Sequence, residues 1–285
     1  NSARPITSNI HNAVSYAVIG LLLTIIALLS IGILLSKKNK LEFIFKLLIV
    51  NLGGIAFILL QTRTGVIAIP LFVLLIALVF FYNQSWLKKC LIIIVGMGIV
   101  FSGIFAIPSM ESRVEKAVSE YKNCIESNIS INSSVCVRMQ LTNASLAIWK
   151  DNLLFGTGDN SQFQDILQTD LLKKGVVTEY TSKNFGEPHN DYMQNLSSFG
   201  ILGIVGLFLL YFVPGYFFFR RLISSADLPP RCIAAMGAAT CLSFPVFSLT
   251  ELMFRNMRTI SFYTTLVVLF LVLLDVYRQS KLTEK

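Results

Sequence analysis

Long apolar runs alternate with short polar segments over most of the chain, and this pattern predicts a bundle of membrane-spanning helices. A helix needs about 20 apolar residues to cross the hydrocarbon core of a bilayer. Seven stretches meet this requirement: 13–35, 43–60, 65–82, 90–108, 201–219, 232–250 and 259–276. Apart from Lys46 and Asp275, both near helix ends, these stretches hold no charged residue. Charges in mid-membrane usually mark ion pathways, so their absence argues against a coupled transporter.

The one long polar stretch, residues 109–200, is too long to be a simple connection and is predicted to form helices outside the bilayer. Apolar residues recur every three or four positions in 111–127, which is typical of an amphipathic helix. Ser134 is expected to cap a second helix over 137–150, and a third helix is expected over 161–174. The predicted domains are four spans in 1–108, the helical loop in 109–200, and three spans with a short tail in 201–285.

Composition supports a lipid environment, since 54% of the residues are hydrophobic and only 14% are charged. Half of the 24 Lys and Arg residues lie in short segments on one side of the bundle, and these segments account for the whole net charge of +8. Short loops rich in Lys and Arg face the cytoplasm, where they meet anionic lipid. The charge therefore indicates membrane lipid rather than nucleic acid as a partner, and the long loop is predicted to lie outside. The chain begins with Asn1 and shows no signal peptide, so we expect it to start inside a longer protein.

Five cysteines are present, and three of them lie in apolar runs as small core residues. The other two, Cys124 and Cys136, enclose a short polar stretch of the long loop. In an oxidising compartment they can pair, and the alternative is two free thiols. No spacing of Cys or His resembles a zinc site, so no metal is predicted.

The chain has two histidines, and both are predicted on the outer side. Pro188 suits the first position of a helix, so a helix is expected to start near His189 and to run continuously into the membrane. An imidazole titrates near neutral pH and can accept a proton from a hydroxyl group. The alternative is a loop histidine that is hydrogen-bonded to a carbonyl. Gly200, Gly203 and Gly206 follow, and close helix packing is the expected reason for their spacing.

Several arginines are predicted on the same side as His189. Arg63 lies in a short turn between two spans, Arg138 begins the second loop helix, and Arg255 and Arg258 lie in the last outer turn. Guanidinium groups bind phosphate through two parallel hydrogen bonds, so arginines gathered at one membrane face suit a lipid-linked diphosphate. The alternative for each is an interfacial anchor that meets lipid phosphate.

These motifs together resemble those of the bacterial O-antigen ligases, O-antigen polymerases and related O-oligosaccharyltransferases. His189-Asn190, nine further residues, Gly200 and then Gly203 look like a signature of that family. The stretch from Arg138 to the Gly156-Thr157-Gly158 turn is similar to another, and Thr62-Arg63-Thr64 to a third. Asn152 stands where the family usually has proline. The resemblance runs from Arg63 to Arg258, and Arg4 resembles a further outer-loop arginine more weakly.

The resemblance implies an all-α polytopic protein of the bacterial inner membrane, with about seven transmembrane helices and one large helical periplasmic loop. It implies transfer of a polysaccharide from undecaprenyl diphosphate to a sugar hydroxyl of lipid A–core. His189 would be the general base, with Arg63 and Arg138 on the diphosphate. The groups expected to orient substrate are Arg258, Arg255, Arg4 and Asn190. No carboxylate cluster is evident beside the arginines, so a metal-independent, inverting reaction without a cofactor is expected. The alternatives are an O-antigen polymerase, a protein O-oligosaccharyltransferase and, from a different class, a lipid-glycan transporter.

Overall fold

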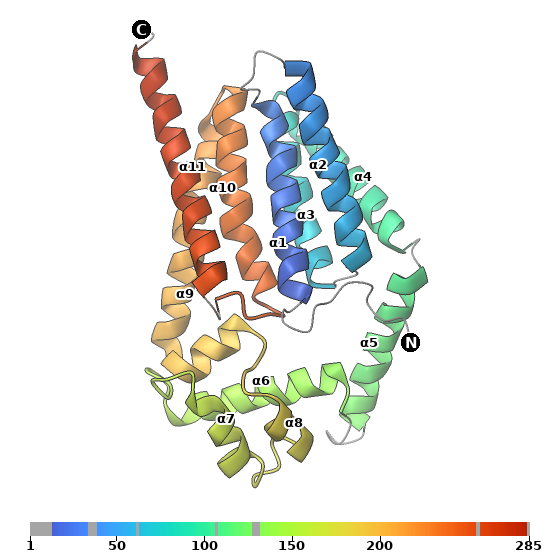
Figure 1. The fold of residues 1–285 in the computed structure, drawn as a ribbon, viewed down its shortest axis with the longest axis vertical. Helices are drawn as coiled ribbons and strands as arrows, with labels where there is room; N and C mark the ends of the chain where they lie inside the picture. The colour runs from blue at the N-terminus through green and yellow to red at the C-terminus, as the bar shows by residue number, and fades with distance from the viewer. Residues whose placement is uncertain are drawn as a thin grey trace. The chain divides into compact units, whose positions relative to one another are not determined.

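The described part of the chain folds mainly into helices and contains no strand (Figure 1). A computed structural model describes residues 13–33, 39–60, 63–105, 108–126, 132–254 and 257–283. The elements are α1 (Ala13–Leu29), the 3-10 turn η1 (Ser30–Gly32), α2 (Asn39–Leu60), α3 (Arg63–Phe80), α4 (Trp86–Phe105), α5 (Pro108–Glu126), α6 (Ser134–Asp151), α7 (Gln162–Ile166), the π-helical turn η2 (Leu167–Leu171), α8 (Glu179–Asn184), α9 (Asp191–Ser224), α10 (Leu228–Phe247) and α11 (Met257–Thr283).

Among the described residues, five helices are long and apolar enough to cross a membrane: α1 with η1, α2, α9, α10 and α11. The chain is accordingly a multi-pass membrane protein. Helix α3 coincides with another predicted span, but its apolar part, Thr64–Phe80, is shorter. Helix α4 coincides with the remaining predicted span and is not among the five. The count of seven spans therefore stays a prediction.

The chain forms two compact units, each described here by itself. Unit 1 consists of residues 1–100, 211–247 and 253–285, and unit 2 of residues 101–210 and 248–252. The chain passes between the units within α4 and α9 and on either side of the short segment 248–252. That segment belongs to unit 2 although helices of unit 1 flank it in the sequence.

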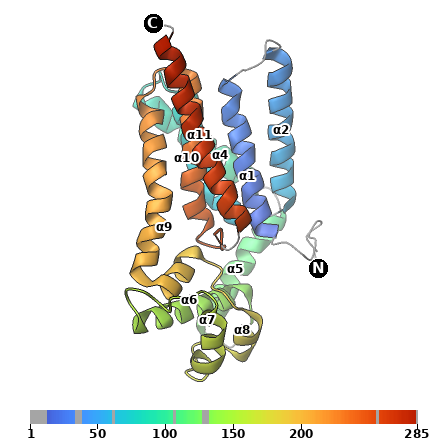
Figure 2. The same ribbon diagram turned by 60° about the vertical axis from the view of Figure 1, so that its left-hand side comes forward.

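Helix α10 forms the centre of unit 1. It contacts α3. It also contacts α1 and α11, and α1 in turn contacts α2 (Figure 2). Small side chains such as Ala234, Ala235 and Ala238 are fully buried along α10 and let the neighbouring helices approach closely. Gly237 is one such point, since a Cβ atom there would lie 2.4 Å from the ring of Phe218 on α9.

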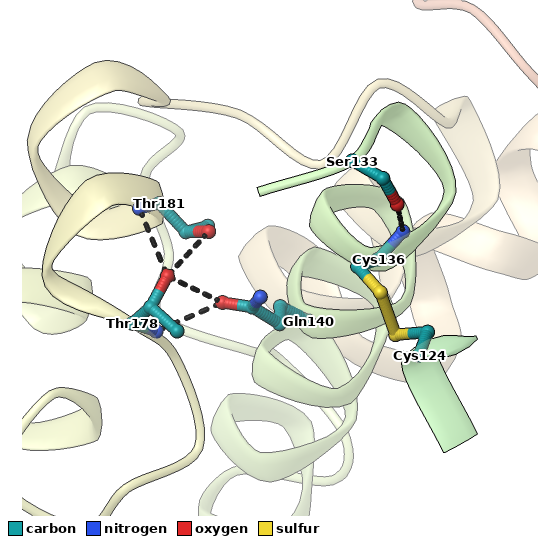
Figure 3. The surroundings of a disulfide bond; sticks show 6 residues. All are labelled: Cys124, Ser133, Cys136, Gln140, Thr178 and Thr181. Atoms are coloured by element: carbon teal, nitrogen blue, oxygen red, sulfur yellow. Dashed lines mark hydrogen bonds between the residues drawn. A yellow bond between two sulfur atoms is a disulfide. The ribbon is translucent and has the colours of Figure 1, made fainter. Parts of the chain in front are cut away.

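Unit 2 has its own apolar core under the loop helices. One face of α6 supplies Val137, Leu141, Ala144 and Ile148, and the segment from α7 onward covers it with Phe163, Leu167, Leu171 and Val177. The three loop helices expected from the sequence are present, the third as α7 continued by η2. The short helix α8 was not expected. The buried amide of Gln140 holds its start, because Gln140 Oε1 accepts from Thr178 N at 2.8 Å and from Thr178 Oγ1 at 3.1 Å (Figure 3).

A disulfide joins α5 to α6, between Cys124 and Cys136 (Figure 3). Of the two states that the sequence left open, the structure therefore contains the paired one. The expected cap of α6 is displaced by one residue. Ser133, not Ser134, stands at the N-cap, where its hydroxyl accepts from Cys136 N at 3.2 Å.

Candidate active site

Helix α9 breaks at Gly200, so the expectation of a continuous helix is wrong. Gly200 has φ 63° and ψ −151°, a conformation that is essentially restricted to glycine. The helix begins at Asp191, two residues after His189, and changes direction at the break. The first part, residues 191–199, therefore carries the histidine end of the motif on a separate short helix.

The segment 153–158, which follows α6, closes the break in α9. A helix end leaves backbone groups without intrahelical partners, and a break creates two such ends. Segment 153–158 serves both ends through four hydrogen bonds: Thr157 N to Ser197 O (3.0 Å), Gly158 N to Ser198 O (2.7 Å), Ile201 N to Leu153 O (3.0 Å) and Leu202 N to Leu154 O (3.4 Å). The Gly-x-Gly turn and the His-Asn…Gly motif therefore form one structure. We call it the elbow, and it consists of segment 153–158 and residues 197–202 of α9.

Two glycines allow this contact. A Cβ atom on Gly156 would lie 2.5 Å from Ser197 O, and one on Gly200 would lie 2.4 Å from Leu154 O. Both residues also have positive φ angles. The expected close packing is thus found at Gly200, although against the loop backbone. It is not found at Gly206, where no described atom lies within 4 Å of a built Cβ.

The turn after segment 153–158 is fixed by polar contacts of its own. Ser161 donates to the Asp159 carboxylate from both its hydroxyl and its backbone N–H. These bonds hold the pKa of Asp159 below its ordinary value. The neighbouring Asn160 accepts through Oδ1 from Gln194 Nε2 at 2.9 Å, which ties the turn to the first part of α9.

Asn190 caps the start of α9. Its Oδ1 atom accepts from the N–H groups of Tyr192 at 2.8 Å and Met193 at 3.2 Å. This is the geometry by which Asn favours helix N-caps. At the same time, Asn190 Nδ2 donates to Leu249 O at 2.9 Å. The side chain expected to bind substrate thus also holds the backbone of the candidate site.

His189 is the residue just before this cap and has φ 53°. Positive φ is uncommon outside glycine, and such residues cluster at functional sites. The imidazole packs edge-on against the ring of Phe185 at a centroid distance of 5.8 Å. Its Nδ1 atom lies 3.9 Å from Glu187 Oε1, and 27% of the side chain is exposed. His189 is therefore held on several sides but remains accessible.

Residues at the start of α9 form hydrogen bonds with the segment 248–252. Asp191, only 2% exposed, accepts through Oδ2 from the Ser248 hydroxyl at 2.6 Å. Its backbone N–H also donates to Ser248 O at 3.1 Å. With the bond from Asn190 to Leu249, the start of α9 is tied to this segment at consecutive positions.

Arg138 on α6 contacts the same segment one residue further on. Its Nη1 donates to Thr250 O, and its Nη2 lies 3.3 Å from Glu251 Oε1. A guanidinium has five N–H groups, and these contacts use two of them. The side chain is 40% exposed and borders a shallow hollow of about 290 Å³ with Met139, Thr142 and Asn143. Arg138 and Asn190, the residue after His189, are thus anchored to one backbone segment within unit 2.

The other predicted site residues are not tested. The side chains of Arg63 and Arg258 lie outside the described residues, and so do Arg4 and Arg255 altogether. Among the described side chains, no three His, Cys, Asp or Glu residues converge as metal ligands would. Metal independence nevertheless stays a prediction.

Sequence reasoning missed three acidic residues of the site. Glu251 pairs with Arg138, Glu187 faces His189, and Asp191 is buried against Ser248. The sequence offered one hint, since Glu187 and Asp191 flank the His-Asn pair. Nothing in the local pattern indicates Glu251, because its partner is 113 residues away.

Comparison with known proteins identifies the family. A family model described as O-antigen ligase matches residues 48–208, which is more than half of the chain. The match includes Arg63, Arg138 and His189, whereas Arg4, Arg255 and Arg258 lie outside it. An uncharacterized protein of Haemophilus influenzae is 24% identical over 241 residues, which cover 83% of this chain and 58% of that protein. The chain thus spans less than two thirds of the length of this relative. Members of the matched family are glycosyltransferase-like enzymes that act on lipid-linked glycans, and the chain belongs to the O-antigen ligase family.

Proposed function

We propose that the protein is an O-antigen ligase of lipopolysaccharide biosynthesis. It would transfer a polysaccharide from undecaprenyl diphosphate to a sugar hydroxyl of lipid A–core. The reaction would take place at the periplasmic face of the bacterial inner membrane. About seven spans would then hold the loop 109–200 on the periplasmic side, as the distribution of Lys and Arg predicts.

One observation carries this proposal. Arg138 and Asn190, the residue next to His189, contact neighbouring residues of the same segment, from Leu249 to Glu251. A base and a phosphate-binding cation are thereby fixed to one scaffold, and positioning of this kind accounts for much of enzymatic rate enhancement. Both residues also lie within the part of the chain that matches the family.

His189 would take the proton of the acceptor hydroxyl as its oxygen attacks the anomeric carbon of the donor. The bond from that carbon to the diphosphate oxygen breaks in the same displacement, so the anomeric configuration inverts. The carboxylate of Glu187, 3.9 Å from Nδ1, would stabilise the imidazolium that results. The proton then leaves His189 for solvent.

Arg138 would bind the diphosphate through the guanidinium N–H groups that do not contact Thr250 or Glu251. Those two contacts would fix the plane of the guanidinium, which is the condition for bidentate phosphate binding. Arg63 is proposed as the second arginine on the diphosphate, and Arg258, Arg255 and Arg4 as groups that orient the donor. Stabilising the charge on the leaving group in this way would make a metal ion unnecessary.

The test is a complementation experiment in the source bacterium. Deleting the gene should leave bare lipid A–core and long glycan on the lipid carrier, and the wild-type gene should restore the lipopolysaccharide ladder. The His189→Ala variant should fail to restore it, at unchanged abundance in the membrane. Lys183→Gln is the matched control, because Lys183 is an exposed residue of unit 2 whose one ion pair within the described part of the chain is with Glu179. Full restoration by His189→Ala would remove the general base from the proposal.

The alternatives give different phenotypes in the same deletion strain. Loss of an O-antigen polymerase leaves lipid A–core that carries a single repeat unit. Loss of a protein O-oligosaccharyltransferase leaves lipopolysaccharide unchanged but removes glycan from Ser or Thr side chains. A lipid-glycan transporter would not need His189. The anchoring of Arg138 and Asn190 to one segment favours an enzyme over a transporter.

A further inference from the structure

Unit 1 contains a basic pocket at the ends of α9 and α11 that the proposed reaction does not use. Its volume is about 450 Å³, and its walls come from the end of α9, the connection to α10, and the last turns of α11. The charged groups around it are Arg221, Arg278, Lys281 and Asp227. The pocket therefore carries an excess of positive charge.

The single acidic group of the pocket is already engaged. Asp227 Oδ2 lies 3.3 Å from Lys281 Nζ and accepts from the Tyr277 hydroxyl at 3.1 Å. The hydrogen bonds from Lys281 and then Tyr277 lower the pKa of Asp227, so the carboxylate stays charged at neutral pH. Among the described residues, no carboxylate forms an ion pair with Arg221 or Arg278. These two guanidinium groups remain available to an anion.

The surroundings of the pocket are those of a membrane interface. Leu274 and Leu282 contribute apolar wall on α11. Just before the basic residues in the sequence, α9 exposes the side chains of Tyr216 and Phe217, and α11 exposes that of Val276. A ligand that fits has an anionic head of phosphate size next to an apolar body. Arginine pairs suit a phosphodiester, because each guanidinium can donate two parallel hydrogen bonds to it.

We infer that this pocket binds the phosphate headgroup of an anionic phospholipid, with Arg221 and Arg278 on the phosphate and the acyl chains along α9 and α11. Basic pockets between transmembrane helices are a recurrent form of lipid recognition on the cytoplasmic side. The distribution of Lys and Arg places this end of the bundle on that side. The site would anchor unit 1 in anionic lipid and is independent of the proposed glycosyl transfer.

The experiment measures lipid retention by native mass spectrometry of the purified full-length protein. Phosphatidylglycerol is titrated against phosphatidylcholine, and inorganic phosphate and glycerol 3-phosphate are added as soluble competitors. Phosphatidylglycerol should be retained in preference. Arg221→Gln and Arg278→Gln should each weaken its binding by about fivefold, and the double variant by more. Both side chains are at least partly exposed, so the substitutions leave the core intact.

Two further variants separate a specific site from general surface charge. Arg220→Gln removes the same charge one residue earlier in α9, outside the pocket lining, and should leave binding unchanged. Asp227→Asn removes the negative charge from the pocket lining and should tighten binding, which an unfolded or damaged pocket would not do.

The inference is overturned if the two lipids bind equally or if Arg220→Gln weakens binding as much as Arg221→Gln does. It is also overturned if Asp227→Asn weakens binding. Displacement of phosphatidylglycerol by millimolar glycerol 3-phosphate or inorganic phosphate would assign the pocket to a soluble phosphate instead. None of these outcomes affects the complementation experiment on His189.

Discussion

The carboxylate of Glu251 lies 3.3 Å from the guanidinium of Arg138, and only 4% of the Glu251 side chain is exposed. The two residues are 113 positions apart, on α6 and on the segment between α10 and α11. A buried carboxylate is costly without a partner, so the pair commits the Arg138 side chain to one orientation. A fixed orientation of the guanidinium is what the proposed phosphate-binding role would require.

Glycan transfer should depend more on the shape of the side chain at position 138 than on its charge. Arg138→Lys keeps the positive charge but loses the planar fork that reaches Thr250 O and Glu251 together. We expect it to lower transfer by about 10²-fold, close to the loss in Arg138→Ala. Glycan transfer in purified membranes would measure the effect, normalised to protein amount. If Arg138→Lys kept near wild-type transfer, the bidentate geometry would be irrelevant.

Asn190 has two contacts that substitutions can separate. Asn190→Asp keeps an oxygen that can accept from Tyr192 N but loses the donor to Leu249 O, whereas Asn190→Ala loses both contacts. Loss of the cap should destabilise α9 by about 1 kcal/mol. Asn190→Asp should therefore retain thermal stability but lose activity, if the hold on segment 248–252 matters for catalysis. Thermal unfolding in detergent and transfer assays would be compared, and equal stability losses in both variants would contradict this division.

The elbow should be intolerant of a methyl group at two positions. At Gly200 the backbone conformation alone should cost alanine about 1–3 kcal/mol, and the clash with Leu154 O adds to it. Gly156→Ala meets Ser197 O in the same way. Both variants should fold poorly and lose transfer. Gly206→Ala is the matched control on the same helix and should be neutral, since no described atom lies near its built Cβ. Protease sensitivity of the membrane-embedded protein is the measurement.

The disulfide between Cys124 and Cys136 should stabilise unit 2 by constraining the chain between α5 and α6. For a loop of 12 residues the expected contribution is about 3 kcal/mol. Cys124→Ser and Cys136→Ser should lower the thermal stability of the protein by similar amounts. Dithiothreitol should destabilise the wild type but have no effect on these two variants. Cys90→Ser, which alters a free cysteine, is the control. If the wild type were insensitive to dithiothreitol, the bond would not contribute.

The helices of the fold could be predicted well because their signal is local. Apolar runs located α1, α2, α9, α10 and α11, and amphipathic spacing located α5 and α6. Boundaries were less secure: Ser133 and Ser134 are equivalent as capping residues, and only the conformation of the chain selects Ser133. Helix α8 is six residues long, too short for periodicity to indicate.

The architecture of the site could not be predicted in the same way, because its contacts join distant segments. The break at Gly200 depends on hydrogen bonds from residues 153–158, and a continuous helix is the local preference in their absence. From the local sequence alone, Glu251 and Ser248 have the character of turn residues. Their contacts with Arg138 and Asp191 are visible only in the tertiary structure. The motif resemblance pointed to Arg138 and Asn190, which the structure anchors to one segment. Their roles and that of His189 stay predictions.

The elbow also couples two stretches of sequence that would otherwise vary separately. A side chain at position 200 would force the backbone at Leu154 to retreat, and the amide hydrogens of Ile201 and Leu202 would then lose their acceptors. A change in one half alone should leave these backbone groups without hydrogen-bond partners. Descendants of this protein should therefore keep or lose both glycine turns in a single evolutionary step.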